Sequence, residues 1–141
     1  MIMNHRKQNI LFLCTGNSCR SQMAEGWARH LHGDRFSVWS AGIETHGLNP
    51  LAVQVMKEAG VDISGHHSKL LEELEDVVFD RVITVCGHAD EHCPLFPDET
   101  NVTYHGFDDP PRMAEGLKTQ TERLDTYRKV CSEIRSFVEE L

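Results

Sequence analysis

The chain has 141 residues, a length typical of one globular domain, and we expect residues 1–141 to form a single domain. Hydrophobic residues make up 40% of the sequence and charged residues 26%, a composition that excludes disordered and fibrous classes. The formal net charge of -8 argues against a general nucleic-acid or anionic-membrane surface, because both need basic patches. We therefore expect no nucleic-acid and no membrane partner, although a local cationic pocket is compatible with this charge.

The cysteine content fits poorly with a framework of structural disulfides, because the number is odd: Cys14, Cys19, Cys86, Cys93 and Cys131. Residues 1–9 are polar, and the apolar run 10–13 is too short for a signal-peptide core or a membrane span. We therefore expect a cytoplasmic protein, and a monomer. Cysteines in that compartment stay reduced, and clusters of them indicate catalysis, redox exchange or metal binding.

The predicted elements alternate between strands and helices. The first half of the chain predicts a buried strand over 9–13, an amphipathic helix over 21–32, a strand over 36–41 and a helix over 50–59. Pro50 suits the first turn of its helix, and Gly60 ends that helix. The second half predicts a short acidic helix over 69–76, a β-branched strand over 81–85 and a weaker strand over 101–104.

A long helix is predicted at the end of the chain. Its apolar face repeats at helical spacing: Leu117, Leu124, Tyr127, Cys131, Ile134, Val138 and Leu141. The alternation of strands and helices predicts an α/β fold, a doubly wound four-stranded parallel sheet flanked by helices. Ligands of such sheets bind beyond the carboxyl ends of the strands, and both Cys14 and Cys86 directly follow a predicted strand.

The loop after the first strand has the sequence CTGNSCR from Cys14 to Arg20. Its residues are small, Gly16 and Asn17 tolerate a left-handed backbone, and a helix begins at its end. Successive N–H groups in such a loop converge on an anion, the helix N-terminus adds partial positive charge, and Arg20 offers two donors. We predict an oxyanion-binding loop formed by Thr15, Gly16, Asn17, Ser18, Cys19, Arg20 and Ser21.

Cys14 is the candidate nucleophile of this loop. The positive field favours its thiolate, so we expect its pKa to fall from about 8.5 toward neutrality or below. Ser21 is placed to donate a hydrogen bond to the sulfur. The alternative is a buried cysteine at a strand end near a surface arginine. For Cys19 and Cys131 we expect packing roles.

An oxyanion reaction also needs an acid for the leaving oxygen. The sequence Asp108-Asp109-Pro110-Pro111 supplies carboxylates on a segment that we expect to be a loop stiffened by two prolines. Asp109 directly precedes Pro110 and is the better candidate. An ordinary acidic turn is the alternative for this segment.

Four blocks of the sequence together resemble a known family. They are residues 14–27 (CTGNSCRSQMAEGW), residues 40–50 (SAGIETHGLNP), Cys86 with Cys93-Pro94, and residues 106–110 (GFDDP). In order and approximate spacing these blocks are similar to the arsenate reductases built on the low-molecular-weight protein tyrosine phosphatase fold. The resemblance covers nearly the whole chain and implies a single catalytic domain over 1–141.

The resemblance also implies a mechanism and its catalytic residues, Cys14, Arg20, Cys86, Cys93 and Asp109. Arsenate binds in the loop, Cys14 attacks arsenic, and Asp109 protonates the departing oxygen. Cys86 then attacks Cys14 and releases arsenite, and Cys93 attacks Cys86 in turn. The Cys86–Cys93 disulfide is reduced by thioredoxin, so the family implies this partner and no bound cofactor. Residues 87–92 must move or partly unwind for that exchange, and Gly87 would help them do so.

At two positions the sequence differs from the parent phosphatases in a way that favours a reductase. Gln22 stands where those phosphatases usually have a proline, and Pro111 stands where they commonly carry tyrosines that pack on a phosphotyrosyl ring. A site without an aromatic wall suits a small inorganic ion. The second and third thiols are the stronger discriminator, because a phosphatase does not need them.

Some of the reductases bind potassium near the loop, through side chains matching Asn17, Glu25 and Ser40 and a hydroxyl and a carboxylate further on. Here His67 and Lys69 occupy those last two positions. A lysine ammonium can stand in for the cation beside Glu25. We therefore expect activity that depends little on potassium.

Two other functions compete with arsenate reduction. A tyrosine phosphatase is the nearer one, since phosphate and arsenate share shape and charge, and weak phosphatase activity is compatible with reductase activity. A metal-binding or redox-sensing protein is the one from another class, and its candidate zinc ligands are Cys86, His88, His92 and Cys93, with His66 and His67. Their spacing does not match a paired Cys-x-x-Cys pattern, so we expect no metal site.

Overall fold

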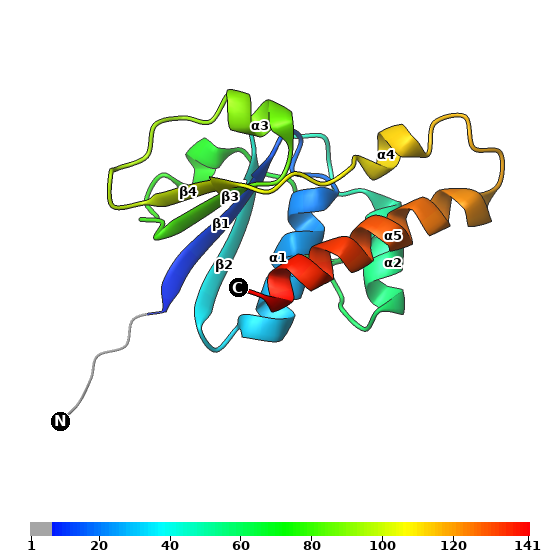
Figure 1. Cartoon of the computed structure of the whole chain (residues 1–141), viewed down its shortest axis with the longest axis horizontal. Helices are drawn as coiled ribbons and strands as arrows, with labels where there is room; N and C mark the ends of the chain where they lie inside the picture. The colour runs from blue at the N-terminus through cyan, green and yellow to red at the C-terminus, as the bar shows by residue number, and fades with distance from the viewer. Residues whose placement is uncertain (1–6) are drawn as a thin grey trace.

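The computed structural model describes residues 7–141. The expectation that the polar N-terminal stretch is not a signal peptide falls in part on residues 1–6, which lie outside the described residues. The sheet contains four parallel strands: β1 (Gln8–Cys14), β2 (Phe36–Gly42), β3 (Arg81–Thr84) and β4 (Asn101–Tyr104). Figure 1 shows the helices between and after these strands, so the predicted α/β fold with a four-stranded parallel sheet is confirmed.

The strand order is β2-β1-β3-β4, which places a topological switch between β1 and β3. From β1 the chain first runs outward to β2, and it then returns to add β3 and β4 on the other side. Connections on the two sides of this point diverge and leave a crevice beyond the carboxyl ends of the strands, where α/β proteins of this kind bind their ligands. Cys14 ends β1 and Cys86 follows β3, so both thiols lie at the crevice.

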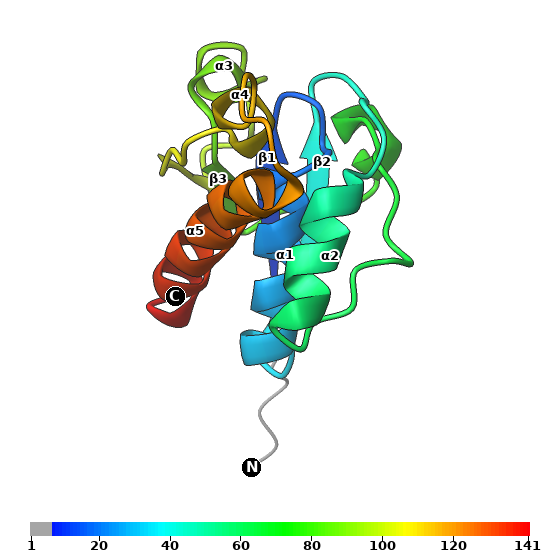
Figure 2. The same cartoon turned by 90° about the vertical axis from the view of Figure 1, so that its right-hand side faces the viewer.

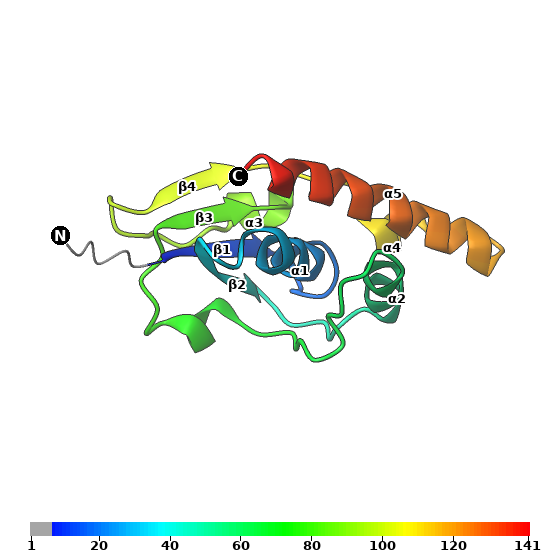
Figure 3. The ribbon, with the colours of Figure 1, turned by 90° about the horizontal axis from the view of Figure 1, so that it is seen from below.

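The helices are α1 (Arg20–His32), α2 (Pro50–Glu58), α3 (Gly87–Glu91), α4 (Pro110–Met113) and α5 (Gln120–Glu139), with a 3-10 turn η1 (Leu71–Leu74). Helix α1 packs on β1 and β2, and α2 and α5 pack against α1. Figures 2 and 3 show these three helices gathered on one side of the sheet. Figure 1 shows α3 beyond the carboxyl ends of the strands, where it contacts β1 and β3.

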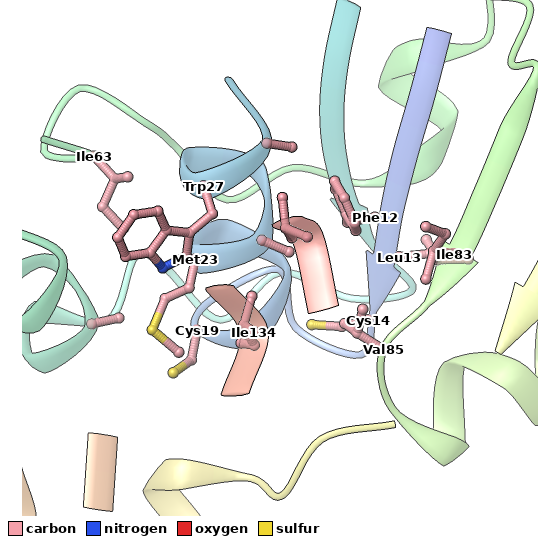
Figure 4. Close-up of a cluster of buried hydrophobic side chains, with 14 of the residues drawn as sticks. Phe12, Leu13, Cys14, Cys19, Met23, Trp27, Ile63, Ile83, Val85 and Ile134 are labelled. Carbon is pink, nitrogen blue, oxygen red and sulfur yellow. The ribbon is translucent and has the colours of Figure 1, made fainter. Parts of the chain in front are cut away.

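The core is built from the predicted apolar runs and stripes. Residues 10–13 of β1 are fully buried, as expected for a central strand covered on both faces. Figure 4 shows Met23 and Trp27 of α1 near Ile63, with Ile134 of α5 nearby. Trp27 also donates from Nε1 to Cys131 Sγ at 3.4 Å, so this cysteine packs in the core as predicted.

Three local predictions need correction, and one short helix was not predicted. Helix α5 begins at Gln120, because Thr119 accepts a hydrogen bond from Glu122 N, so Leu117 packs beside the helix rather than on it. The predicted acidic helix over 69–76 is only the 3-10 turn η1. The segment that was expected to be a proline-stiffened loop begins the helical turn α4, since proline suits a first turn that needs no amide donor. Helix α3 was not predicted, because it has too few residues to show a periodic pattern in the sequence.

Helix α5 provides a direct test of the core. Ile134 is fully buried, so Ile134→Ala should lower the free energy of unfolding by about 2–5 kcal/mol, because it removes apolar contacts and leaves a cavity. Urea denaturation measures the change. The neighbouring exposed variant Glu133→Ala is the control and should stay within about 0.5 kcal/mol of the wild type. Equal effects of the two variants would show that α5 does not pack as described.

Candidate oxyanion site

The loop of residues 14–20 is held from behind by residues 43–49. Four carbonyl oxygens of the loop accept hydrogen bonds from amides of that segment: Cys14 from Ile43 (3.1 Å), Thr15 from Glu44 (2.8 Å), Gly16 from His46 (2.9 Å) and Ser18 from Asn49 (3.0 Å). The Asn17 carbonyl accepts from Gln22 Nε2 at 3.1 Å. All five successive carbonyl oxygens therefore accept hydrogen bonds from groups outside the loop.

A trans peptide points its N–H opposite to the carbonyl of the preceding residue. Since the carbonyls of residues 14–18 turn outward, the amides of residues 15–19 turn to the other side of the loop. Within residues 7–141 these five amides donate no hydrogen bond. Except for Asn17, the residues of these amides line a cavity of about 370 Å³, whose full lining is Cys14, Thr15, Gly16, Ser18, Cys19, Arg20, His46, Asn49, Asp109 and Pro111. The arrangement is an anion nest at the N-terminus of α1.

Asn17 fixes the turn of the loop. Its φ of 47° is left-handed, a conformation that asparagine tolerates better than most residues. Its side-chain oxygen accepts from Lys69 N (2.9 Å) and Gln22 Nε2 (3.0 Å), and its amide nitrogen donates to Ser21 Oγ (2.9 Å) and Ser40 Oγ (3.0 Å). A buried side chain with every polar atom paired holds the backbone in this conformation.

A backbone carbonyl orients the side chain of Arg20. Its Nη1 donates to the Phe107 carbonyl at 3.0 Å, and its Nη2 lies 3.8 Å from Asp109 Oδ2. Asp109 is 40% exposed, lines the cavity, and makes no side-chain hydrogen bond to the start of α4, so its carboxyl group is free to reach a bound ion. Asp108 is exposed and does not line the cavity.

Cys14 and Cys86 are electrostatically coupled, since each thiol shifts the pKa of the other. Ser21 Oγ donates to Cys14 Sγ at 3.2 Å, and Thr15 Oγ1 lies 3.2 Å from Cys86 Sγ. The Ala89 amide also donates to Cys86 Sγ at 3.4 Å. Two sulfurs from different strands therefore share one hydrogen-bonded cluster, and all five cysteines of the chain are free thiols.

The expectation that the loop lowers the pKa of Cys14 is wrong for the protein without a bound ion. Its hydrogen bond with Cys86, followed by burial, raises the pKa of Cys14 well above its usual range, and the opposing effects of Ser21 and Arg20 are smaller. The pKa of Cys86 is lowered to about 5, chiefly by the hydrogen bond from Cys14 and also by Thr15 and Ala89. The two shifts arise from one coupled pair of thiols, so the raised and the lowered pKa are properties of the pair.

Cys93 lies apart from this pair. It follows the C-terminal end of α3, whereas Cys86 stands at the N-terminal end, so the two are separated by roughly 10 Å at a helical rise of 1.5 Å per residue. A disulfide requires Cα atoms within about 6.8 Å. Burial, and then the Asp90 carboxylate, raise the pKa of Cys93. The geometry therefore brings together Cys14, Arg20, Cys86 and Asp109 and leaves Cys93 outside.

Glu25 forms a buried ionic cluster behind the loop. Its carboxylate accepts from Ser40 Oγ at 2.5 Å and pairs with Arg29 at 3.0 Å, His66 at 3.7 Å and Lys69 at 3.9 Å. Lys69 therefore lies beside Glu25, as the sequence predicts. His66 is the histidine of this cluster, whereas the side chain of His67 is exposed.

Other residues of the site carried no clear signal in the sequence. His46 and Asn49 line the cavity, but a single histidine and a single asparagine in a turn-rich segment match no chemical pattern. Within residues 7–141 no group of three or more histidine, cysteine or carboxylate side chains is arranged to hold a metal ion. Over the same residues, no helix has the length and apolar character needed to cross a membrane.

Residues 9–141 match the family of low molecular weight phosphotyrosine protein phosphatases, and the chain belongs to this family. It is 51% identical over 130 residues to an arsenate reductase of Bacillus licheniformis, a match covering 91% of this chain and 90% of that protein. It is 49% identical over 133 residues to an arsenate reductase of Bacillus subtilis, covering 93% and 92%. A solved structure of an arsenate reductase in the phosphate binding state aligns with a TM-score of 0.75 at 31% identity, covering 94% and 95%.

The thiol pair predicts the pH dependence of alkylation. In the wild type, Cys86 should react with iodoacetamide as a thiolate down to about pH 5, because Cys14 donates a hydrogen bond to it. Cys14→Ala removes that donor, so the midpoint of the Cys86 reaction should move upward toward the range of an ordinary thiol. Mass spectrometry of the modified peptides measures both midpoints, and Cys93→Ser serves as the control. An unchanged midpoint in Cys14→Ala would contradict the pairing.

Proposed function

We propose that this protein reduces arsenate to arsenite, using Cys14, Cys86 and Cys93 as a relay of thiols, and that thioredoxin regenerates it in the cytoplasm. The observation that carries the proposal is a second thiol, Cys86, which is electrostatically coupled to Cys14 and lies 3.2 Å from Thr15 Oγ1 of the loop that lines the cavity. Arsenate reduction takes up two electrons, and two thiols that form a disulfide supply them. The names of the curated relatives support the same activity.

In the first step, the free amides of the loop and the guanidinium of Arg20 bind the arsenate oxygens. The proton of Cys14 passes to the neighbouring Cys86 thiolate, and this transfer leaves the net charge of the pair unchanged. The Cys14 thiolate then attacks arsenic and displaces one hydroxyl group of the ion, and Asp109 protonates that hydroxyl so that it leaves as water. The support for Asp109 is its place in the cavity beside Arg20, at 3.8 Å.

In the second step, Cys86 passes its proton to an oxygen of the departing arsenic group and attacks Cys14 Sγ. The sulfur–sulfur bond forms as the sulfur–arsenic bond breaks, and the electron pair of the broken bond stays on arsenic, which is thereby reduced and released as arsenite. Both thiols become oxidised, and the electrons balance. This step is supported by the mutual pKa shifts of the two thiols and by the 3.2 Å distance between Cys86 Sγ and the hydroxyl of Thr15, the residue next to Cys14.

In the third step, Cys93 attacks Cys86 and frees Cys14. The separation of roughly 10 Å along α3 means that this helix must unwind first. Helix α3 has only 5 residues, and a few bonds hold it, including Thr84 Oγ1 to Asp90 Oδ1 at 3.1 Å. A dithiol reductant such as thioredoxin then exchanges with the Cys86–Cys93 disulfide and restores the starting state.

Variants of the three thiols test the relay in a coupled assay that follows NADPH oxidation with arsenate, thioredoxin and thioredoxin reductase. Cys14→Ser, Cys86→Ser and Cys93→Ser should each reduce multiple turnover by at least about a hundredfold, because each removes one exchange step. Cys93→Ser should accumulate a Cys14–Cys86 disulfide, which non-reducing peptide mapping detects.

Cys131→Ser is the matched control, since that thiol lies in the core away from the cavity. It should keep turnover close to the wild type even if it unfolds at a lower temperature. Full multiple turnover in Cys93→Ser would remove the third thiol from the mechanism, whereas full turnover in Cys86→Ser would overturn the relay as a whole.

Phosphatase activity is the second candidate, because Cys14, Arg20 and Asp109 would serve phosphoryl transfer from an aryl phosphate equally well, and the family is named for it. Pro111 at the cavity mouth presents a small ring to the ion rather than an aromatic wall. Hydrolysis of an aryl phosphate that outpaces arsenate reduction would reverse the order of the two proposals.

The Glu25 cluster supports the proposal that potassium has little effect. The Lys69 ammonium lies 3.9 Å from Glu25 and supplies the positive charge that a bound cation would supply. The melting temperature and turnover should therefore be equal in potassium chloride and in sodium chloride at the same ionic strength. Lys69→Asp replaces the ammonium by a carboxylate and should make both quantities depend on potassium, whereas the exposed control Lys57→Asp should not.

A further inference from the structure

His46 occupies a place in the cavity that the proposed mechanism does not use. Its imidazole lies directly over Gly16 of the loop, so closely that a Cβ on Gly16 would lie 2.2 Å from His46 Nδ1. The His46 amide donates to the Gly16 carbonyl, and the ring lines the same cavity as Cys14, Arg20 and Asp109. The absence of a side chain at Gly16 is therefore what admits this ring to the site.

The ring is oriented by one acceptor. His46 Nε2 lies 2.7 Å from Glu44 Oε2, and an ionised carboxylate only accepts hydrogen bonds, so Nε2 carries a hydrogen. Nδ1, the ring atom nearest to Gly16, has no hydrogen-bond partner among residues 7–141. A polar atom at the edge of an anion cavity is thus left available to a ligand.

We propose that His46 is a further binding residue for the oxyanion, with Nδ1 contacting an outer oxygen of the bound ion and Glu44 holding the ring in place. This inference rests on the proposed oxyanion binding. With Nε2 protonated, Nδ1 accepts a hydrogen bond from a hydroxyl of the ion when the ring is neutral and donates to a charged oxygen when the ring is an imidazolium. The protonated ring also adds a second cation to the one supplied by Arg20.

Two substitutions separate the roles of the ring atoms. His46→Gln places a polar group near Nε2 and leaves nothing at Nδ1, so the dissociation constant for inorganic phosphate and the KM for arsenate should rise roughly tenfold, the effect of one hydrogen bond to a charged group. His46→Asn places an amide at Nδ1. It should keep most of the affinity for phosphate, because the amide replaces the contact made by Nδ1.

The measurements are calorimetric titration with inorganic phosphate at several pH values and steady-state arsenate kinetics. For both variants kcat should stay within about twofold, because His46 takes no part in the thiol chemistry, and thermal unfolding checks that they fold. His30→Gln, on the exposed side of α1 away from the cavity, is the matched control and should bind phosphate like the wild type.

Two results would overturn the inference in distinguishable ways. If the wild type binds phosphate and reduces arsenate but folded His46→Gln binds equally well at each pH, His46 has no role in binding and the proposed function stands. If the wild type neither binds phosphate nor reduces arsenate, the proposed function fails and the inference fails with it.

Discussion

The site depends on hydrogen bonds made on the side of the loop away from the ligand. Five successive carbonyls of residues 14–18 accept hydrogen bonds from amides of residues 43–49 and from Gln22, and the amides of four residues that line the cavity, Thr15, Gly16, Ser18 and Cys19, are left available within residues 7–141. A loop held only by its own conformation would have to be ordered by the anion, which lowers affinity. Here the folding of the chain has already oriented the donors, and the β2–α2 connection acts as part of the binding site although only its margin reaches the cavity.

Reactive groups lie on both sides of the topological switch between β1 and β3. The amide-lined loop follows one strand and the second thiol follows the other, so the parallel pairing of these strands sets the contact between the two sulfurs. Neither thiol has the acidity that its own loop would suggest, because each shifts the pKa of the other. The protonation state of the site is a property of the pair.

Strand patterns and turn residues were sufficient to predict three of the strands and the three long helices, because buried strands and amphipathic helices have strong patterns, whereas β4 is exposed along its length and gave only a weaker signal. The position of the loop of residues 14–20 between a strand and a helix was also predictable, since its small residues follow an apolar run and precede a helical pattern. The raised pKa of Cys14 was not, because it depends on Cys86, which lies 72 positions away in the sequence. Helices α3 and α4 are shorter than any periodic pattern, and His46 acquires its place only when the two loops pair.

One hydrogen bond of Cys86 links the oxidation state of this residue to the stability of helix α3. Its sulfur accepts a hydrogen bond from the Ala89 amide and so acts as the N-cap of α3. A thiolate is a strong acceptor at a helix N-terminus, whereas a sulfur in a disulfide is a poor one, and the loss of an N-cap typically weakens a helix by about 1 kcal/mol. Oxidation of Cys86 would therefore loosen the helix that separates it from Cys93, at the point in the proposed cycle when that separation must close.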